Sequence, residues 1–296
     1  MQSWILATAA GLAVVPSAMA APARLVTTPQ ALARELGARD LVILQVGDSA
    51  GYGVGHIPGA RMVNLAELAA PMTNEALILE LPDPAALRAK LSALGISDRS
   101  RIVVVPTKEG IQSATRVVFT LDAAGLGGRT RLLEGGTPAW AAEGRALETT
   151  PPAAATPGKL KAFTYRPLVA DAAYVKAHLS APGYVIVDAR APEFYAGTRV
   201  GGAMGRTHKT GHIAGARSVF FGAVTTPDLK LAPEAEIAKR FKDAGVKAGD
   251  EVIVYCHVGQ QATATLFAAR TLGIKAKLYD GSFEEWSRLD GAVAAQ

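Results

Sequence analysis

A single cysteine, Cys256, occurs among the 296 residues, so the chain cannot form an internal disulfide. A large charge of either sign is also missing, because the formal net charge is +5 and the basic residues are scattered along the chain. This distribution argues against a nucleic-acid partner. One cysteine with one adjacent histidine supplies too few ligands for a metal ion, so neither a metal site nor a cofactor is expected.

The first 20 residues have the pattern of a secretory signal peptide. Their apolar core, residues 4–15, is too short to span a bilayer, Pro16 breaks it, and residues 18–20 offer a cleavage site of small residues. An uncleaved anchor is the alternative, since no Lys or Arg precedes the apolar core. Cleavage would leave an exported, periplasmic protein that has no attachment to the membrane.

The sequence repeats itself with a period of roughly 150 residues, which is typical of a duplicated domain. Both halves carry a Gly-His-Ile-x-Gly-Ala-Arg segment, at residues 55–61 and 211–217. Each half ends on a tryptophan that follows a glycine-containing turn, Trp140 in the first and Trp286 in the second. Between these two matches lies a third, residues 94–105 with residues 244–255, and three matches in the same order indicate two domains of one kind.

A Pro-rich segment, residues 149–158, separates the two halves and is interpreted as a linker. It places the domains at residues 22–148 and 159–296. Each half alternates short apolar strands with helical stretches, such as residues 84–94 and 233–244. This alternation predicts an α/β fold in which each half is a mostly parallel sheet with helices on both faces.

Cys256 lies between a predicted strand, residues 252–255, and a predicted helix, residues 262–272. Backbone N–H groups of a tight loop and of a helix N-terminus together form an anion site. Cysteine pKa values in such places fall from about 8.5 into the range of roughly 3.5–7.5. The sequence therefore predicts a nucleophile that is ionised at neutral pH. A free cysteine that only packs in a core is the alternative.

The loop resembles the active-site loop of the rhodanese (sulfurtransferase) superfamily, in which a cysteine opens a six-residue loop with glycine at its fourth position. The residues here are Cys256, His257, Val258, Gly259, Gln260 and Gln261. Together with the repeat, the likeness extends to tandem rhodanese-like sulfurtransferases, in which only the second domain holds the catalytic cysteine. The resemblance implies transfer of a sulfane sulfur from a small anionic donor, thiosulfate or 3-mercaptopyruvate, to a thiol or cyanide through a Cys256 persulfide.

The first half has lost the groups that this chemistry needs. Alignment of the repeats places Pro106 where the second half has Cys256, and proline has neither a nucleophile nor a backbone N–H. Glu109 stands opposite Gly259, where a carboxylate would repel an anionic substrate. The first domain is therefore predicted to be catalytically silent and to supply a wall of the site.

Besides the loop residues 257–261, two arginines are candidate substrate-binding residues. Arg190 ends a predicted strand and could bind an anion, or it could form a salt bridge with Asp188 or Glu193. Arg199 belongs to a basic, Gly-rich insertion, residues 197–211, which could provide an anion site beside the cysteine. A solvated surface loop is the alternative for this insertion.

Histidines in and around the loop receive separate interpretations. His257 is the only residue of the loop that could carry a positive charge, although an unperturbed histidine is mostly neutral at pH 7. His56 and His212 occupy the same place in the two repeats, and one of these repeats has no thiol, which favours a structural role for both.

The donor and the class of function stay open at this level. Glu193 and Phe194 stand where members of the family that act on thiosulfate or mercaptopyruvate carry a substrate-binding arginine. A cysteine phosphatase would need an arginine at the position of Ala262. A periplasmic module that carries or senses sulfane sulfur without turnover is the remaining alternative.

Overall fold

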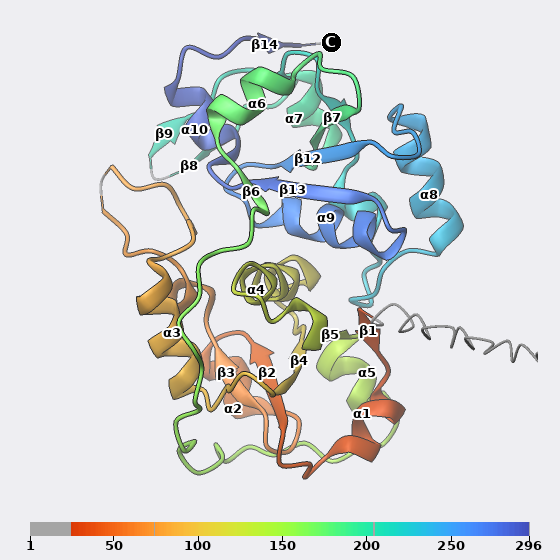
Figure 1. The fold of residues 1–296 in the computed structure, drawn as a ribbon. Coiled ribbons are helices and arrows are strands. Elements are labelled where there is room, and N and C mark those ends of the chain that lie inside the picture. The colour runs from red at the N-terminus through yellow and green to blue at the C-terminus, as the bar shows by residue number, and fades with distance from the viewer. Residues whose placement is uncertain (1–24, 74, 204, 296) are drawn as a thin grey trace, which may run out of the picture.

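The computed structural model describes residues 25–73, 75–203 and 205–295. The predicted signal peptide, residues 1–20, lies outside the described residues. The described residues form two five-stranded sheets, one in each half of the sequence, and Figure 1 shows them on opposite sides of a central pair of helices. Within the described ranges, no helix is both long enough and apolar enough to cross a membrane.

The first sheet is parallel throughout and has the spatial order β1-β5-β4-β2-β3. Its strands are β1 (Val26–Thr27), β2 (Leu41–Val46), β3 (Arg61–Val63), β4 (Arg101–Val105) and β5 (Thr130–Leu133). The helices of this half are α1 (Pro29–Glu35), α2 (Ser49–Val54), α3 (Pro84–Ala93), α4 (Ile111–Ala123) and α5 (Gly136–Ala142), with 3₁₀ turns η1 (Leu65–Leu68) and η2 (Gly127–Arg129). Side-chain oxygens of Thr28, Asp48 and Asp83 accept hydrogen bonds from the first turns of α1, α2 and α3, which fixes where these helices begin.

The second sheet is also parallel and has the order β11-β7-β12-β13-β6. Its strands are β6 (Val169–Ala170), β7 (Tyr184–Asp188), β11 (Arg217–Ser218), β12 (Glu251–Tyr255) and β13 (Lys275–Tyr279). The helices are α6 (Ala172–His178), α7 (Pro192–Ala196), α8 (Glu234–Asp243), α9 (Gln261–Thr271) and α10 (Ser282–Arg288), with one 3₁₀ turn, η3 (Phe221–Ala223). Two short antiparallel pairs join β8 (Gly202–Ala203) to β9 (Arg206–Thr207) and β10 (His212–Ile213) to β14 (Val293–Ala294). Corresponding strands have the same order in both sheets, so the repeat of the sequence is a repeat of structure.

Each sheet is buried on both faces because successive residues of a strand point to opposite sides. In β12, Val252 and Val254 pack with α8 and α9, whereas Ile253 and Tyr255 pack with α6 and α10. The strand sequences are therefore continuous apolar runs, which is typical of parallel strands buried on both faces. The predicted α/β architecture with helices on both faces is confirmed.

The two halves meet along α4 and α9, which lie next to each other at the centre of the molecule (Figure 1). The ring of Phe119 on α4 belongs to the core of the second half, and the ring of Phe267 on α9 belongs to the core of the first. Thr115 and Thr263 share a buried hydrogen bond of 2.9 Å across this contact. Because α9 directly follows the Cys256 loop, that loop lies at the interface of the two halves.

Residues 149–168, all of which the structure describes, contain no helix or strand. Part of this segment packs on the first half: Leu160 is buried in the first core, and a Cβ at Gly158 would lie only 2.0 Å from the carbonyl oxygen of Ile96. The second sheet begins at Val169. The predicted linker and the domain boundary at residue 159 stay predictions.

Candidate active site

Cys256 follows β12, the central strand of the second sheet, and is 1% exposed. Burial raises the pKa of the Cys256 thiol. Hydrogen bonding from the backbone N–H groups of Ala262, Val258, Gly259 and Gln261 acts in the opposite direction. The strand, tight loop and helix N-terminus are thus arranged around the sulfur as the sequence predicts.

The prediction that the resting thiol is ionised at neutral pH is wrong, however. Burial outweighs the N–H groups, so the pKa of Cys256 lies above that of an ordinary cysteine rather than below it. The physical reason is the loss of water around the charged form, which the sequence pattern does not reveal. The N–H groups stabilise negative charge at this sulfur, but the free-energy cost of desolvating that charge is larger in the resting site.

A serine that sequence reasoning missed holds the backbone of Cys256. The Cys256 N–H donates to Ser282 Oγ over 3.2 Å, and this hydroxyl donates to the Tyr279 carbonyl oxygen over 2.8 Å. Ser282 is fully buried and has φ of 53°, a left-handed conformation that costs energy for a residue with a Cβ. The corresponding residue of the first half is Gly136, with φ of 55°. Alignment of the repeats could have revealed this replacement of glycine by serine.

The first half contacts the loop through Arg116 on α4, which is 3% exposed. Its guanidinium forms a buried ion pair with Asp280 and donates to the Gly259 carbonyl oxygen over 3.2 Å. Gly259 has φ of 77°, and a Cβ there would lie 2.7 Å from the Asp280 carbonyl oxygen, so glycine is required. Sequence reasoning missed Arg116 because it is separated from the loop by more than a hundred residues and contacts it only in the folded chain.

The two glutamines of the loop have different environments. Gln260 donates from Nε2 to Ser113 Oγ of α4 over 2.9 Å, which adds a second contact from the first half. The Gln261 Oε1 atom is buried and has no hydrogen-bond partner among the described residues. Val258 is partly buried.

His257 carries no positive charge at neutral pH. Its ring packs edge-on against Phe194 at 4.6 Å and lies 5.5 Å from the ring of His208. Burial lowers the pKa of His257 to about 3, and the positive charges of Arg190, His208 and Arg199 act in the same direction. His257 therefore does not provide the positive field that the sequence interpretation considered for it.

Arg190 is 1% exposed and forms a bidentate ion pair with Asp188, with Nη2–Oδ2 at 2.6 Å. The Tyr255 hydroxyl donates to the same carboxylate over 2.7 Å, and the guanidinium carbon lies 3.9 Å from the centre of the Phe283 ring. Burial lowers the pKa of Arg190, but Asp188, Tyr255 and Cys256 together hold it above its ordinary value. The sequence left two roles open for Arg190, a salt bridge and anion binding. The structure shows the salt bridge with Asp188, and contact with a substrate stays a prediction.

The basic insertion, residues 197–211, lies against His257 and α10. Arg206 and His208 both contact the buried Glu284, at 3.2 Å and 2.6 Å. Arg199 pairs instead with Glu193 at 3.7 Å; its side chain is 65% exposed, and its guanidinium lies over the ring of Phe194 at 4.9 Å. The insertion thus offers an exposed arginine close to the loop, in a solvent-accessible ion pair, while the buried Glu284 pairs with Arg206 and His208.

His56 and His212 occupy equivalent buried positions. Each stacks on a tyrosine of its own half, His56 on Tyr52 at 3.9 Å and His212 on Tyr195 at 3.8 Å. These contacts agree with a structural role. Within residues 25–73, 75–203 and 205–295, no group of three or more His, Cys, Asp or Glu side chains is arranged to hold a metal ion.

The structure places Pro106 directly after β4, as Cys256 follows β12. The four residues after it, 107–110, lead into α4, and Glu109 in this loop is exposed. The place of the nucleophile is therefore taken by a residue that has neither a thiol nor a backbone N–H.

Replacement of Arg116 by methionine leaves the Asp280 carboxylate buried without its partner. We expect the free energy of unfolding, measured by urea titration, to fall by about 3–5 kcal/mol. Lys239→Met is the control, because the Lys239–Asp243 pair on α8 is exposed to solvent and its loss should cost less than about 1 kcal/mol. Equal losses in the two variants would contradict a supporting role for Arg116.

The low pKa of His257 predicts acid sensitivity. Between pH 6.5 and about 3 the unfolded state binds a proton at this imidazole and the native state does not, so stability rises with pH and is lost as the pH falls through this window. Wild type should lose about 2 kcal/mol more than His257→Gln between pH 7 and pH 4.5, measured by urea titration at each pH. Parallel losses in the two proteins would rule out this contribution.

Comparison with known sequences agrees with this geometry. The rhodanese-like domain family matches the chain twice, at residues 28–143 and 171–289. The thiosulfate sulfurtransferase of Pseudomonas aeruginosa is 34% identical over 263 residues, which cover 88% of this chain and 93% of that protein. A protein of the same organism named "Probable 3-mercaptopyruvate sulfurtransferase" is 33% identical over 273 residues, with the same two coverages.

Solved structures share the fold. YnjE superposes with a TM-score of 0.81 at 24% identity and covers 92% of this chain and 68% of its own. The Tum1 protein of Saccharomyces cerevisiae superposes with a TM-score of 0.75 at 19% identity and covers 90% of this chain and 95% of its own. This chain belongs to the rhodanese-like family and is a sulfurtransferase with two tandem rhodanese-like domains.

Proposed function

We propose that this sulfurtransferase carries the transferred sulfur on Cys256. The observation that carries the proposal is the convergence of four backbone N–H groups on this one sulfur, at the C-terminal end of the central strand. Such groups favour negative charge at the atom they surround, in a thiolate or in the terminal sulfur of a persulfide.

The reaction proceeds in two displacements. The Cys256 thiolate attacks the outer sulfur of thiosulfate, the S–S bond of the donor breaks, and sulfite leaves with the bonding electron pair. An acceptor, cyanide or a thiolate, then attacks the outer sulfur of the persulfide and restores the Cys256 thiolate. Because burial raises the pKa of the resting thiol, its proton is lost during the first displacement and is taken up by the departing sulfite, a base.

The backbone N–H groups of Val258, Gly259, Gln261 and Ala262 provide the binding groups in this proposal, since they hydrogen-bond to the Cys256 sulfur. His257 is neutral and shapes the site by packing. The buried Oε1 of Gln261 is available to accept a hydrogen bond from a protonated acceptor or product.

The donor is an anion, and thiosulfate is preferred over 3-mercaptopyruvate in this proposal. The relatives named above support both donors. Arg199 is the substrate-attracting cation that we assign, because it is stacked on Phe194 beside His257 and its pair with Glu193, at 3.7 Å, is exposed to solvent and therefore weak. Arg190 is paired with Asp188 and also donates to the Gly211 carbonyl oxygen over 2.8 Å, so this proposal gives it a supporting role.

The protein acts outside the cytoplasm in this proposal, after removal of residues 1–20. The support is the apolar core of residues 4–15, followed by Pro16 and by the small residues Ala18 and Ala20. N-terminal sequencing of protein from a periplasmic extract tests it: a first residue other than Ala21, or retention in the membrane fraction, counts against export by cleavage.

Removal of the Arg199 charge should weaken attraction of the donor. Arg199→Gln is expected to raise the KM for thiosulfate by about threefold at low salt, with kcat little changed and the difference reduced at high salt. Arg240→Gln, an exposed arginine on α8, is the control. An unchanged KM in Arg199→Gln would remove this residue from the binding site.

Replacement of the nucleophile tests the function itself. Cys256→Ser should lower thiosulfate:cyanide turnover by at least about a thousandfold, because a serine hydroxyl is not ionised here and forms no persulfide. Far-UV circular dichroism and the urea midpoint check that the variant is folded. Substantial turnover by the folded variant would disprove the role of Cys256.

A further inference from the structure

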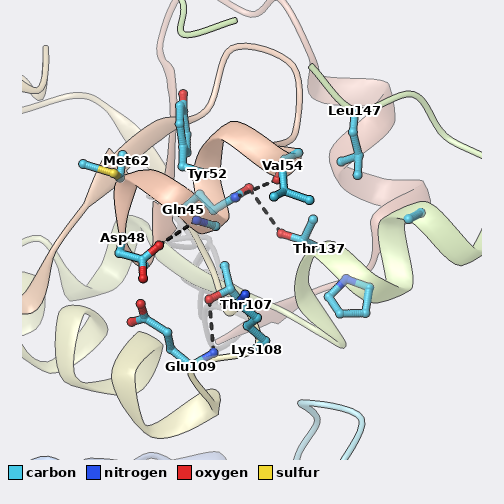
Figure 2. Close-up of a pocket in the computed structure, with 15 residues that line it drawn as sticks. Gln45, Asp48, Tyr52, Val54, Met62, Thr107, Lys108, Glu109, Thr137 and Leu147 are labelled. Atoms are coloured by element: carbon cyan, nitrogen blue, oxygen red, sulfur yellow. Dashed lines mark hydrogen bonds between the residues drawn. The ribbon is translucent and has the colours of Figure 1, made fainter. Parts of the chain in front are cut away.

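The first half contains a cavity of about 270 Å³, the first-half cavity, at the C-terminal ends of β2 and β4. It corresponds in position to the surroundings of Cys256 in the second half. Figure 2 shows its lining, which comes from β2, α2, β3, the loop after β4, α5 and the segment after α5. The mechanism proposed above makes no use of it.

Small residues in the first half create this space. Three of the residues that line the cavity stand where the second half has large side chains: Gly47 for Arg190, Gly51 for Phe194, and Thr137 for Phe283. The first two matches follow from the strand register, since β2 pairs with β4 as β7 pairs with β12. The third follows from the alignment of α5 with α10. In the second half the Arg190 guanidinium lies over the Phe283 ring at 3.9 Å, and the Phe194 ring packs edge-on against His257 at 4.6 Å.

The polar groups in the wall of the cavity are already engaged. Gln45 is 2% exposed, its Oε1 accepts from Thr137 Oγ1 over 3.2 Å, and its Nε2 donates to the Gly55 carbonyl oxygen over 3.1 Å. The Tyr52 hydroxyl donates to the Ala60 carbonyl oxygen. Because these polar groups already have partners, the surface that a ligand would contact is mainly apolar. The cavity therefore suits a ligand with an apolar part, such as a ring.

Charge is concentrated on one side of the opening. The carboxylates of Asp48 and Glu109 lie on the same side in Figure 2, and the first of these accepts from the Gly51 N–H over 2.6 Å. Lys108 lines the same opening, which leaves an excess of one negative charge. Val54, at 81% exposure, adds an apolar rim. The charge preference is thus opposite to that of the donor site in the second half.

We propose that the first-half cavity binds a small apolar molecule that bears an ammonium or amidinium group. The apolar body fills the space left by the three small residues, and the cationic group lies between the Asp48 and Glu109 carboxylates. Binding needs no reaction at Cys256, so this proposal stands or falls separately from the proposed function.

Benzylammonium is a suitable probe, with benzyl alcohol and benzoate as uncharged and anionic comparators of similar size. Titration of the full-length protein, followed by NMR of the Met62 methyl group that lines the cavity, should give tighter binding of benzylammonium than of benzoate by at least about fivefold. Glu109→Gln should weaken benzylammonium binding by about two- to fivefold, and Lys108→Gln should strengthen it.

Refilling the space supplies the matched controls. Thr137→Phe and, separately, Gly51→Phe restore side chains found at the corresponding positions of the second half, and each should abolish the Met62 response. Unchanged thiosulfate:cyanide turnover shows that each variant is folded. Tighter binding of benzoate, weaker benzylammonium binding in Lys108→Gln, or full benzylammonium affinity in both folded refilled variants would overturn the proposal.

Discussion

The backbone ring around the Cys256 sulfur is held in place by a buried ion pair that joins the two halves of the molecule. Arg116 comes from the first half and Asp280 from the second, and the same guanidinium holds the carbonyl oxygen of Gly259. A buried ion pair is tolerated only when its remaining hydrogen-bonding groups are satisfied. Here Leu81 and Leu79 backbone groups complete the set. The half without a nucleophile therefore takes part in shaping the loop of the half that has one.

Two opposing effects act on the sulfur. Burial disfavours its charged form, while backbone N–H groups favour it, and burial is the larger in the resting site. The N–H dipoles already point at the sulfur, so no free energy is needed to reorient them when negative charge develops on it. The arrangement of the Cys256 loop therefore suits a sulfur that gains charge during transfer more than one that is charged at rest. The strained backbone of Ser282, which holds the Cys256 N–H, belongs to the same preorganised site.

The sequence was sufficient for those features that depend on local pattern. The β-branched run before Cys256, the glycine in the loop and the helix formers after it predict the strand, loop and helix, because each signal acts over a few residues. The parallel sheets with helices on both faces follow from the alternation of such segments. The internal repeat led to the equivalence of Pro106 and Cys256, which the strand positions support.

Features that depend on contacts between distant residues were missed. Burial of Cys256 results from packing of both halves, and this burial reversed the predicted direction of its pKa shift. The Arg116–Gly259 contact joins different halves, and no local pattern marks it. Glu284 pairs with His208 of the basic insertion, which a count of charges in the insertion alone does not reveal.

Intact-protein mass spectrometry after incubation with thiosulfate tests the central claim most directly. The account predicts a mass gain of one sulfur atom, located on Cys256 by peptide mapping and removed on addition of cyanide. Sustained turnover of thiosulfate by a protein in which Cys256 never carries the additional sulfur would contradict it.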